Sequence, residues 1–245
     1  MKKSLLTLLL CIPALSLAAI NNPPPRILMV VSSHGKLGNT DRKTGYYLSE
    51  LTHPYYRFKQ AGYKITIVSP QGGDAPMYAV KKSDPINRRF LNSANAMKQV
   101  QNTLKPSEIN PKNYAAIYYA GGTGTMWDFP QNKKLADIAS TIYEQGGVVS
   151  ADCHGPAALL NVKLKNDKRL IQGKNLTSFT NAEEKAAGFT KYAPFSLEDA
   201  LIKQGANYKA APNFTSHVVI DGRLITGQNP ASATAVADAV IKKLN

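Results

Sequence analysis

The feature that most constrains the fold is an apolar run that ends at a Cys-His pair and continues into a helix-forming segment. Residues 148–152 read Val-Val-Ser-Ala-Asp, Cys153 and His154 follow, and residues 155–160 read Gly-Pro-Ala-Ala-Leu-Leu. A buried strand that turns sharply into a helix lifts the residue at the turn above the sheet, where N–H groups at the helix start point toward its side chain. The pattern therefore predicts a nucleophile elbow in which Cys153 is the nucleophile.

The amino-terminal residues predict a secretory signal peptide. A positively charged start precedes an apolar run over residues 4–17, and small residues mark a cleavage site near Ala18 or Ala19. The run is shorter than the roughly 20 residues that a membrane-spanning helix needs. We therefore expect residues 1–19 to be removed, the mature protein to be periplasmic or secreted, and no segment to be inserted in a membrane.

Removal of this leader leaves a single thiol. The chain has two cysteines, and Cys11 lies within the predicted signal peptide. An odd cysteine in an exported protein indicates either a disulfide between chains or a reactive thiol. The sequence around Cys153 favours the reactive thiol.

Composition and charge argue for one globular domain. Hydrophobic residues make up 43% of the chain, and the formal charge of +14 falls to +12 without Lys2 and Lys3. The basic residues are scattered in pairs, with no long basic tract or zinc motif, so we favour a solvated basic surface over nucleic-acid binding. The mature chain of about 225 residues suits a linker over residues 20–25 and a single domain over residues 26–245.

Strand-like runs alternate with helical patterns along this domain. Strands are expected at residues 26–33, 63–69, 114–120, 147–152, 176–179, 217–220 and 223–226, and helices at 44–60, 133–145, 197–204 and 231–244, with a polar helix within 76–106. The expected boundaries include Thr44 as the cap of the first helix, Gly62 as its stop, and Asn229 as the cap of the last helix. Such alternation predicts βαβ units and a mainly parallel sheet, whose ligands gather at the carboxyl ends of the strands.

The pair Gly121-Gly122 follows one of these strands. Glycine lets the backbone approach a substrate closely, so these residues are candidates for an oxyanion hole or a substrate-binding turn. No Gly-Lys-Ser/Thr follows, and the later glycine of a dinucleotide fingerprint is missing. We therefore expect no nucleotide and no other cofactor.

The acid–base partners of the thiol are less clear from the residues. His154 is a candidate base or an oxyanion donor, and composition alone describes Glu50 as a solvated helix residue. Glu183 and Glu184 fall at a predicted helix start, where carboxylates are favoured. The residues alone leave the choice among the three carboxylates open. The remaining histidines lack ligand spacing, so we expect no metal site.

Taken together, the motifs of the chain resemble the ThiJ/PfpI superfamily, and more narrowly its glyoxalase III-like, heat-shock-chaperone branch. The matching strings are Ser32-Ser33-His34, Lys43-Thr44-Gly45 with Glu50 and His53-Pro54, residues 61–73, Gly121-Gly122 with Met126-Trp127-Asp128, Cys153-His154-Gly155-Pro156, residues 173–180, and residues 226–233. The resemblance covers nearly all of the mature chain. It implies a class I glutamine-amidotransferase-like fold: a flavodoxin-like three-layer α/β/α sandwich with a mainly parallel sheet and a Cys nucleophile elbow.

The resemblance also assigns roles that the residues left open. Cys153 is then the nucleophile, and Glu50 is the buried acid that shares a proton with the thiol. His154 is the second member of a triad, and Glu184 matches its third, acidic member. Glu183 stays the alternative, because one residue of gap placement decides between the two.

Two positions depart from the pattern of the family. The family usually has His at the position of Thr123 and a small or apolar residue at the position of Asp152. If the Asp152 carboxylate lies near the sulfur, it raises the pKa of the thiol.

The N–H groups of Gly122 and His154 match the family's oxyanion donors.

The leading hypothesis is a cofactor-free, glutathione-independent glyoxalase III-like lyase, a D-lactate dehydratase. It would convert methylglyoxal and similar 2-oxoaldehydes into 2-hydroxy acids through a hemithioacetal on Cys153. The alternatives are a Cys-dependent amidase or peptidase-like hydrolase and a holdase stress chaperone. The resemblance also implies a homodimer.

Overall fold

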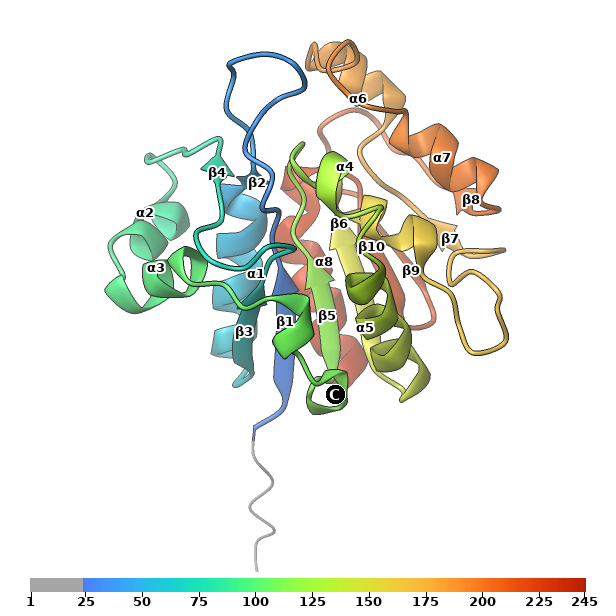
Figure 1. The fold of residues 1–245 in the computed structure, drawn as a ribbon, viewed down its shortest axis with the longest axis horizontal. Helices are drawn as coiled ribbons and strands as arrows, with labels where there is room; N and C mark the ends of the chain where they lie inside the picture. The colour runs from blue at the N-terminus through green and yellow to red at the C-terminus, as the bar shows by residue number, and fades with distance from the viewer. Residues whose placement is uncertain (1–23) are drawn as a thin grey trace, which may run out of the picture.

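The apolar runs of the sequence form a six-stranded sheet in the order β3-β1-β5-β6-β10-β9 (Figure 1). Five strands are parallel, and β9 alone runs antiparallel to its neighbour β10. The computed structural model describes residues 24–245. The sheet strands are β3 (Lys64–Val68), β1 (Arg26–Val30), β5 (Ala116–Tyr119), β6 (Val148–Asp152), β10 (Leu224–Gly227) and β9 (Val218–Asp221).

Helices cover both faces of this sheet. The α-helices are α1 (Leu48–Gln60), α2 (Pro85–Leu91), α3 (Ala94–Gln101), α4 (Thr125–Asp128), α5 (Lys133–Glu144), α6 (Asn181–Ala186), α7 (Leu197–Lys203) and α8 (Ala233–Leu244). Four 3₁₀ helices lie at Pro106–Glu108, Pro111–Asn113, Gly155–Asn161 and Pro230–Ser232, and the short strands β2 (Tyr46–Tyr47), β4 (Met77–Tyr78), β7 (Asn175–Leu176) and β8 (Asn207–Tyr208) pair as β2-β4 and β7-β8.

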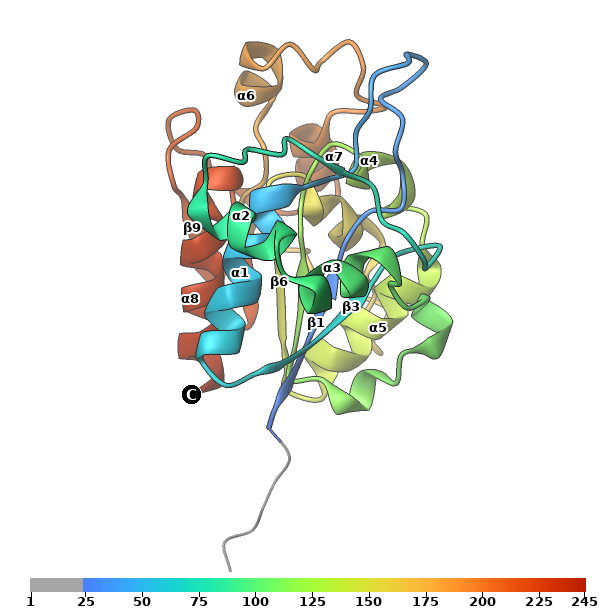
Figure 2. The same cartoon turned by 90° about the vertical axis from the view of Figure 1, so that its left-hand side faces the viewer.

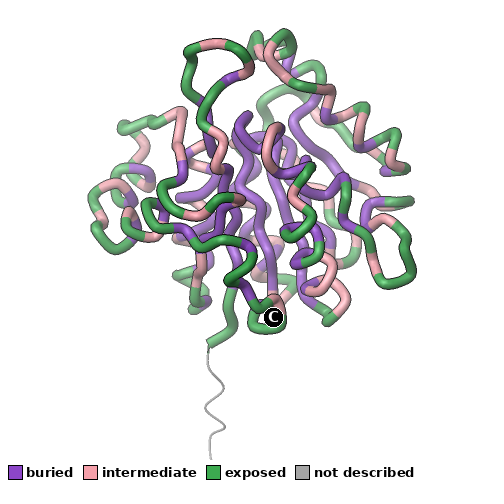
Figure 3. The backbone as a smooth tube through the Cα atoms, viewed as in Figure 1, coloured by how far each residue is buried: buried purple, intermediate pink, exposed green. Residues whose placement is uncertain are grey.

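The expected three-layer α/β/α sandwich is confirmed. Figure 2 shows α1 and α8 on one side of the sheet and α5 on the other. Alternate residues of β1 point into the two cores: Ile27 and Met29 pack on the α1 side, and Leu28 and Val30 pack on the α5 side. Figure 3 shows buried backbone throughout the central strands and exposed backbone in the surrounding loops. The near-continuous apolar strands follow from this burial on both faces.

Several element boundaries differ from the expectation. The first helix begins at Leu48 rather than at Thr44, and Thr44 is not its cap, because residues 46–47 form β2 first. The segment 76–106 holds two short helices rather than one, and the expected strand over residues 176–179 is reduced to the two residues of β7. Local propensity did not reveal these breaks because they depend on pairing with distant segments.

The expected stop of the first helix is confirmed, whereas the expected cap of the last helix is not. Gly62 follows α1 with a positive φ of 87°. Asn229 accepts the N–H of Ala231 and caps the 3₁₀ helix Pro230–Ser232, whereas α8 begins at Ala233 with Ser232 as its N-cap, so the expectation that Asn229 caps the last helix is wrong. The segment after Cys153 is a 3₁₀ helix, Gly155–Asn161, rather than an α-helix.

The predicted signal peptide over residues 1–19 lies outside the described residues, as does the linker except for Pro24 and Pro25. Within residues 24–245, no helix combines the length and the apolarity that a membrane crossing requires.

Candidate active site

Cys153 lies on a strained turn directly after β6. Its φ is 54°, in the left-handed region that a residue with a Cβ seldom adopts. The N–H of Cys153 donates to the carbonyl of Gly227 at 3.0 Å, and its carbonyl accepts the N–H of Phe179 at 2.7 Å. Hydrogen bonds from two separate segments therefore hold the strained conformation. The side chain is raised above the carboxyl end of the sheet, as in a nucleophile elbow.

A line of three side chains runs from the sulfur toward α6. The Sγ of Cys153 lies 3.2 Å from Nδ1 of His154, and Nε2 of His154 lies 2.5 Å from Oε1 of Glu184. His154 is 1% exposed, so it is not a solvated residue at the start of a helix. Because a carboxylate accepts at Nε2, the imidazole proton lies there, and the Nδ1 lone pair faces the thiol. The arrangement suits proton transfer from the thiol to His154.

The two adjacent glutamates of α6 have different surroundings. Oε2 of Glu183 accepts the N–H of Thr180, and Oε1 accepts the Phe214 N–H at 2.7 Å and the Asn229 amide at 2.8 Å. Glu183 therefore completes a capping box and ties α6 to the loop before β9. Glu184, one residue later, faces His154, and its Oε2 has no partner among the described residues. The geometry selects Glu184 as the triad acid.

Glu50 lies on the other side of the sulfur, in the first turn of α1. It is fully buried, so the description of a solvated helix residue, which composition alone suggested, is wrong. Within residues 24–245, neither carboxyl oxygen has a geometrically sound hydrogen-bond partner, and the thiol of Cys153 is the side chain beside it. Burial first, and then the charge of Asp152, raise the pKa of Glu50 well above its usual range. A protonated Glu50 is therefore stable beside the sulfur.

Asp152 is the third carboxylic acid described near Cys153, after Glu184 and Glu50, and it is also fully buried. Its Oδ1 accepts the N–H of Gly121 at 3.1 Å. Burial raises the pKa of Asp152 well above its usual range, while a Tyr118 contact and the Gly121 N–H oppose the rise. Burial, followed by the charges of Glu50 and Asp152, raises the pKa of Cys153. The sulfur is therefore a thiol that needs a base at the moment of attack.

The two glycines of the Gly121-Gly122 turn are used differently. A Cβ on Gly121 would lie 2.3 Å from Oε2 of Glu50, and one on Gly122 would lie 2.4 Å from the Tyr47 nitrogen. Neither position tolerates a side chain. The Gly121 N–H is engaged by Asp152, whereas the Gly122 N–H points at the sulfur of Cys153. Gly122 is thus the better placed of the two to stabilise an oxyanion, and the oxyanion role of His154 stays a prediction.

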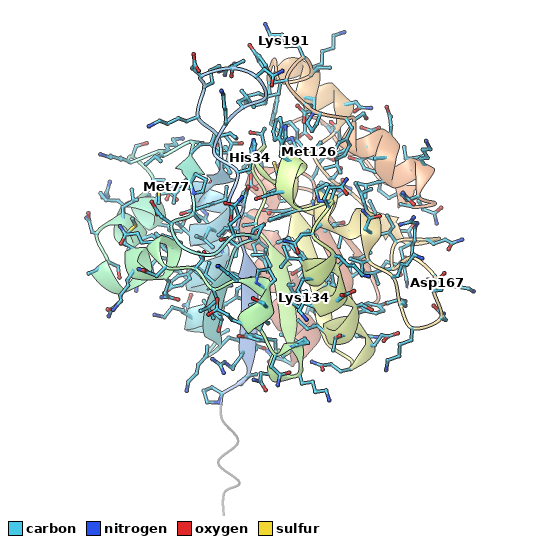
Figure 4. All side chains as sticks on the ribbon, viewed as in Figure 1. His34, Met77, Met126, Lys134, Asp167 and Lys191 are labelled. Carbon is cyan, nitrogen blue, oxygen red and sulfur yellow. The ribbon has the colours of Figure 1, made fainter. Side chains whose placement is uncertain are left out.

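A narrow cavity, too tight to hold a water molecule, lies beside Glu184. Its walls are Leu37, Thr123, Met126, Trp127, Glu184, Phe189 and Ala193. Figure 4 labels Met126 and His34 at the carboxyl end of the sheet, and the His34 ring stacks on Trp127 with centroids 4.9 Å apart. Because the cavity is too tight for a substrate as it stands, its walls must move during entry. The mainly apolar lining suits a small uncharged molecule.

The loop over residues 36–43 closes this cavity. Leu37 is 3% exposed and forms part of the wall, and the Arg42 guanidinium lies 5.1 Å from the Tyr192 ring on the opposite side. Thr44, at the foot of the loop, hydrogen bonds to Thr123 through their hydroxyl groups. Sequence reasoning did not find this cover, because its contacts join segments 80 to 150 residues apart.

His34 and His53 have ordinary hydrogen-bonding roles. His53 lies 2.9 Å from Asp84 and His34 contacts the Lys36 carbonyl. Among residues 24–245, no group of three or more His, Cys, Asp or Glu side chains is arranged to hold a metal ion.

Comparison with known families and proteins gives consistent matches. The model of the DJ-1/PfpI family matches residues 43–243. Glyoxalase 3 of Candida albicans is 33% identical over 88% of this chain and 97% of its own length. The glutathione-independent glyoxalase HSP31 of Saccharomyces cerevisiae is 34% identical over 87% of this chain and 95% of its own.

Solved structures agree with these matches. The 24 kDa Rapid Encystment Protein of Francisella tularensis is 44% identical, with a TM-score of 0.88 over 90% of this chain and 99% of that one. Glyoxalase III of Candida albicans is 31% identical, with a TM-score of 0.84 over 90% and 98% of the two chains.

Proposed function

The chain belongs to the DJ-1/PfpI family, and from this premise we propose that it is a glutathione-independent glyoxalase acting on methylglyoxal and similar small 2-oxoaldehydes. The observation that carries the proposal is the line of Cys153, His154 and Glu184 with the buried carboxyl of Glu50 on the opposite side of the sulfur. Relatives that carry the name of this activity support it over almost their whole length.

The reaction begins at the aldehyde carbon. The sulfur of Cys153 forms a bond to this carbon while Nδ1 of His154, 3.2 Å from Sγ, takes the thiol proton. The carbonyl becomes an alkoxide, which the Gly122 N–H stabilises, and protonated Glu50 gives its proton to the alkoxide, which yields a hemithioacetal and the Glu50 carboxylate. Glu184 holds the imidazolium that forms, as the acid of a triad does.

Glu50 then moves the carbon-bound proton. Its carboxylate removes the hydrogen from the first carbon, giving an enediol, and returns a proton to the second carbon, while the hydroxyl proton passes between the two oxygens. The product is a thioester of a 2-hydroxy acid. Water hydrolyses it: the Glu50 carboxylate takes a proton from the water, the hydroxide adds to the thioester carbonyl, and the imidazolium of His154 returns its proton to the departing sulfur, which releases the acid and the thiol. Methylglyoxal and water thus give lactate with no external oxidant or reductant.

We propose that the product is D-lactate and that the enzyme is a lyase, a D-lactate dehydratase. The test measures lactate formed from methylglyoxal without glutathione, with enantiomer-specific detection, by wild-type protein and by Cys153→Ala. D-lactate that disappears with the substitution supports the proposal. L-lactate overturns the stereochemistry, and no product from a reduced wild-type thiol overturns the activity.

The same triad geometry favours amide hydrolysis as a second candidate, because a Cys-His-Glu line also activates sulfur for attack on an amide carbonyl. Release of a chromogenic amine from short peptide amides, lost in Cys153→Ala, would favour the hydrolase. Suppression of aggregation that survives Cys153→Ala would instead favour the holdase. Export of the mature protein and a homodimer remain predictions, to be checked by amino-terminal sequencing and by light scattering.

A further inference from the structure

Asp152 is a buried acid that the mechanism above does not use. It ends β6, directly before the nucleophile, and its side chain is fully buried. Its Oδ1 accepts the Gly121 N–H, but its Oδ2 has no partner among the described residues. An unpartnered carboxyl oxygen inside a protein is costly, which makes its presence beside a reactive centre informative.

Three acidic groups meet around one glycine. A Cβ on Gly121 would lie 2.3 Å from Glu50 Oε2, 2.5 Å from the Asp152 carbonyl and 2.8 Å from the Cys153 Cβ. The absence of a side chain on Gly121 therefore lets the Glu50 carboxyl lie against the backbone of Asp152 and Cys153, while the Gly121 N–H donates to the Asp152 carboxyl at 3.1 Å. Both carboxyls lie in a dry interior.

No cation in the described part of the chain balances these carboxyls. None of the ion pairs within residues 24–245 includes Glu50 or Asp152. His154 lies on the far side of the sulfur and is bound to Glu184. The other titratable groups that face the pair are the thiol and the phenols of Tyr47, Tyr78 and Tyr118, which burial keeps neutral by raising their pKa values. Two uncompensated carboxyls in such a site cannot both ionise, so at least one of them keeps its proton.

The hydrogen bonds decide which carboxyl holds this proton. Asp152 accepts the Gly121 N–H at 3.1 Å, which favours its anion, whereas neither oxygen of Glu50 has a hydrogen-bond partner among the described residues. The Tyr118 hydroxyl donates its hydrogen bond to the Glu50 backbone carbonyl at 2.9 Å rather than to either carboxyl. We propose that Asp152 is a positioning residue whose ionised carboxylate keeps the proton on Glu50 and thereby makes Glu50 first the acid and then the base of the reaction.

The inference rests on the proposed function for its catalytic consequence. Protonated Glu50 gives its proton to the alkoxide formed when the sulfur adds to the aldehyde. The resulting carboxylate then lies beside ionised Asp152, and the repulsion between the two makes Glu50 a stronger base for the carbon-bound hydrogen. Removal of this hydrogen restores protonated Glu50 and relieves the repulsion, and return of the proton to the second carbon leaves Glu50 ionised to take a proton from the attacking water. Asp152 itself forms and breaks no bond.

The test compares wild type with Asp152→Asn, in which the amide oxygen can still accept the Gly121 N–H. We expect the pH profile of Cys153 alkylation by iodoacetamide to shift down by about one unit, since one nearby charge is removed. The alkylation rate at pH 7 should rise about threefold, because a tenfold gain in thiolate is partly offset by its weaker nucleophilicity. Turnover of methylglyoxal should instead fall about threefold to tenfold, with its acid limb displaced to lower pH.

A purely structural role for Asp152 would leave both pH profiles unchanged, and that result overturns the inference. Asp128→Asn is the matched control, since Asp128 is a buried acid at the same end of the sheet that binds Ser32 and Ser33 rather than the thiol. It should leave the alkylation profile unmoved. In a Glu50→Gln background, Asp152→Asn should give no further loss of turnover.

Infrared difference spectroscopy tests the position of the proton without depending on Asp152→Asn folding. A protonated carboxyl band present in wild type at pH 7 and absent in Glu50→Gln supports the inference, and a band that persists in Glu50→Gln overturns it. The alkylation and infrared experiments do not depend on turnover of methylglyoxal. A wild type that is inactive on methylglyoxal but shows these results refutes the glyoxalase and not the proton assignment.

Discussion

The two sides of Cys153 hold their acids in opposite ways. On the α6 side, Glu184 has an imidazole 2.5 Å away, and His154 occupies the space between the acid and the sulfur. On the α1 side, Glu50 and Asp152 are fully buried, and no ion pair within the described residues includes them. A paired carboxylate orients and stabilises a charge, whereas an unpaired buried carboxyl stores a proton. The site therefore separates orientation from proton storage across one sulfur atom.

The largest effect should come from the α1 side. Glu50→Gln removes the group that moves the carbon-bound proton, and general acid–base catalysis contributes about 10²- to 10⁴-fold, so we expect kcat to fall about 10³-fold. Alkylation of Cys153 should persist, because His154 still faces the sulfur. Steady-state kinetics with methylglyoxal measures the loss. Glu108→Gln, at an exposed acid, serves as the control, and a Glu50→Gln protein with near-normal kcat would contradict the assignment.

The next effect separates the two adjacent glutamates of α6. Glu184→Gln should lower kcat about 10²-fold while leaving the melting temperature nearly unchanged, since it weakens the support of His154 but breaks no backbone contact. Glu183→Gln should do the reverse. It weakens hydrogen bonds to Thr180, Phe214 and Asn229, and we expect a loss of about 2 kcal/mol of stability with kcat within twofold. Equal effects of the two substitutions on kcat would remove the distinction.

The contrast between these glutamates also marks what sequence can predict. The elbow at Cys153 was readable because an apolar strand, a turn and a helix-forming run occur in one continuous segment. The burial of Glu50 was not readable from composition, because it depends on β5 and β6 placing Gly121 and Cys153 against α1. Likewise, only the distant Asn229 and Phe214 reveal that Glu183 is an anchor. Local structure can be predicted from a continuous segment of sequence, whereas the partners of a buried acid are set by the tertiary fold.

A smaller effect is expected on the pH dependence of the free energy of unfolding, and it comes from Glu50 on the α1 side. The folded-state pKa of Glu50 lies above its unfolded value, so the folded state binds more protons and loses stability as pH rises from the unfolded pKa toward the folded one. Glu50→Gln removes this loss of stability at high pH. We expect it to be more stable than wild type at pH 8 by about 1–3 kcal/mol, with the gain vanishing below about pH 4. Urea titrations at the two pH values measure the difference.

Glu184→Gln sharpens this comparison, because Oε1 of Glu184 has the His154 imidazole as its hydrogen-bond partner, whereas neither oxygen of Glu50 has a partner among the described residues. A gain at pH 8 for Glu184→Gln as large as that for Glu50→Gln would mean that the two sides do not differ in how they hold charge.

The smallest effect tests whether the cover over both sides moves. Arg42→Ala removes the contact of the guanidinium with the Tyr192 ring, and an exposed contact of this kind contributes about 0.5–1 kcal/mol. The loop over residues 36–43 should then open more often, so kcat/KM should rise about twofold with kcat unchanged. Arg89→Ala is the matched control, because Arg89 makes the same contact with Tyr56 away from the cavity. A rise in both variants, or in neither, would exclude the loop as the barrier to entry. A rise only in Arg42→Ala would mean that the loop over residues 36–43 limits substrate entry. The contact between Arg42 and Tyr192, rather than Glu50 or Glu184, would then keep this loop closed.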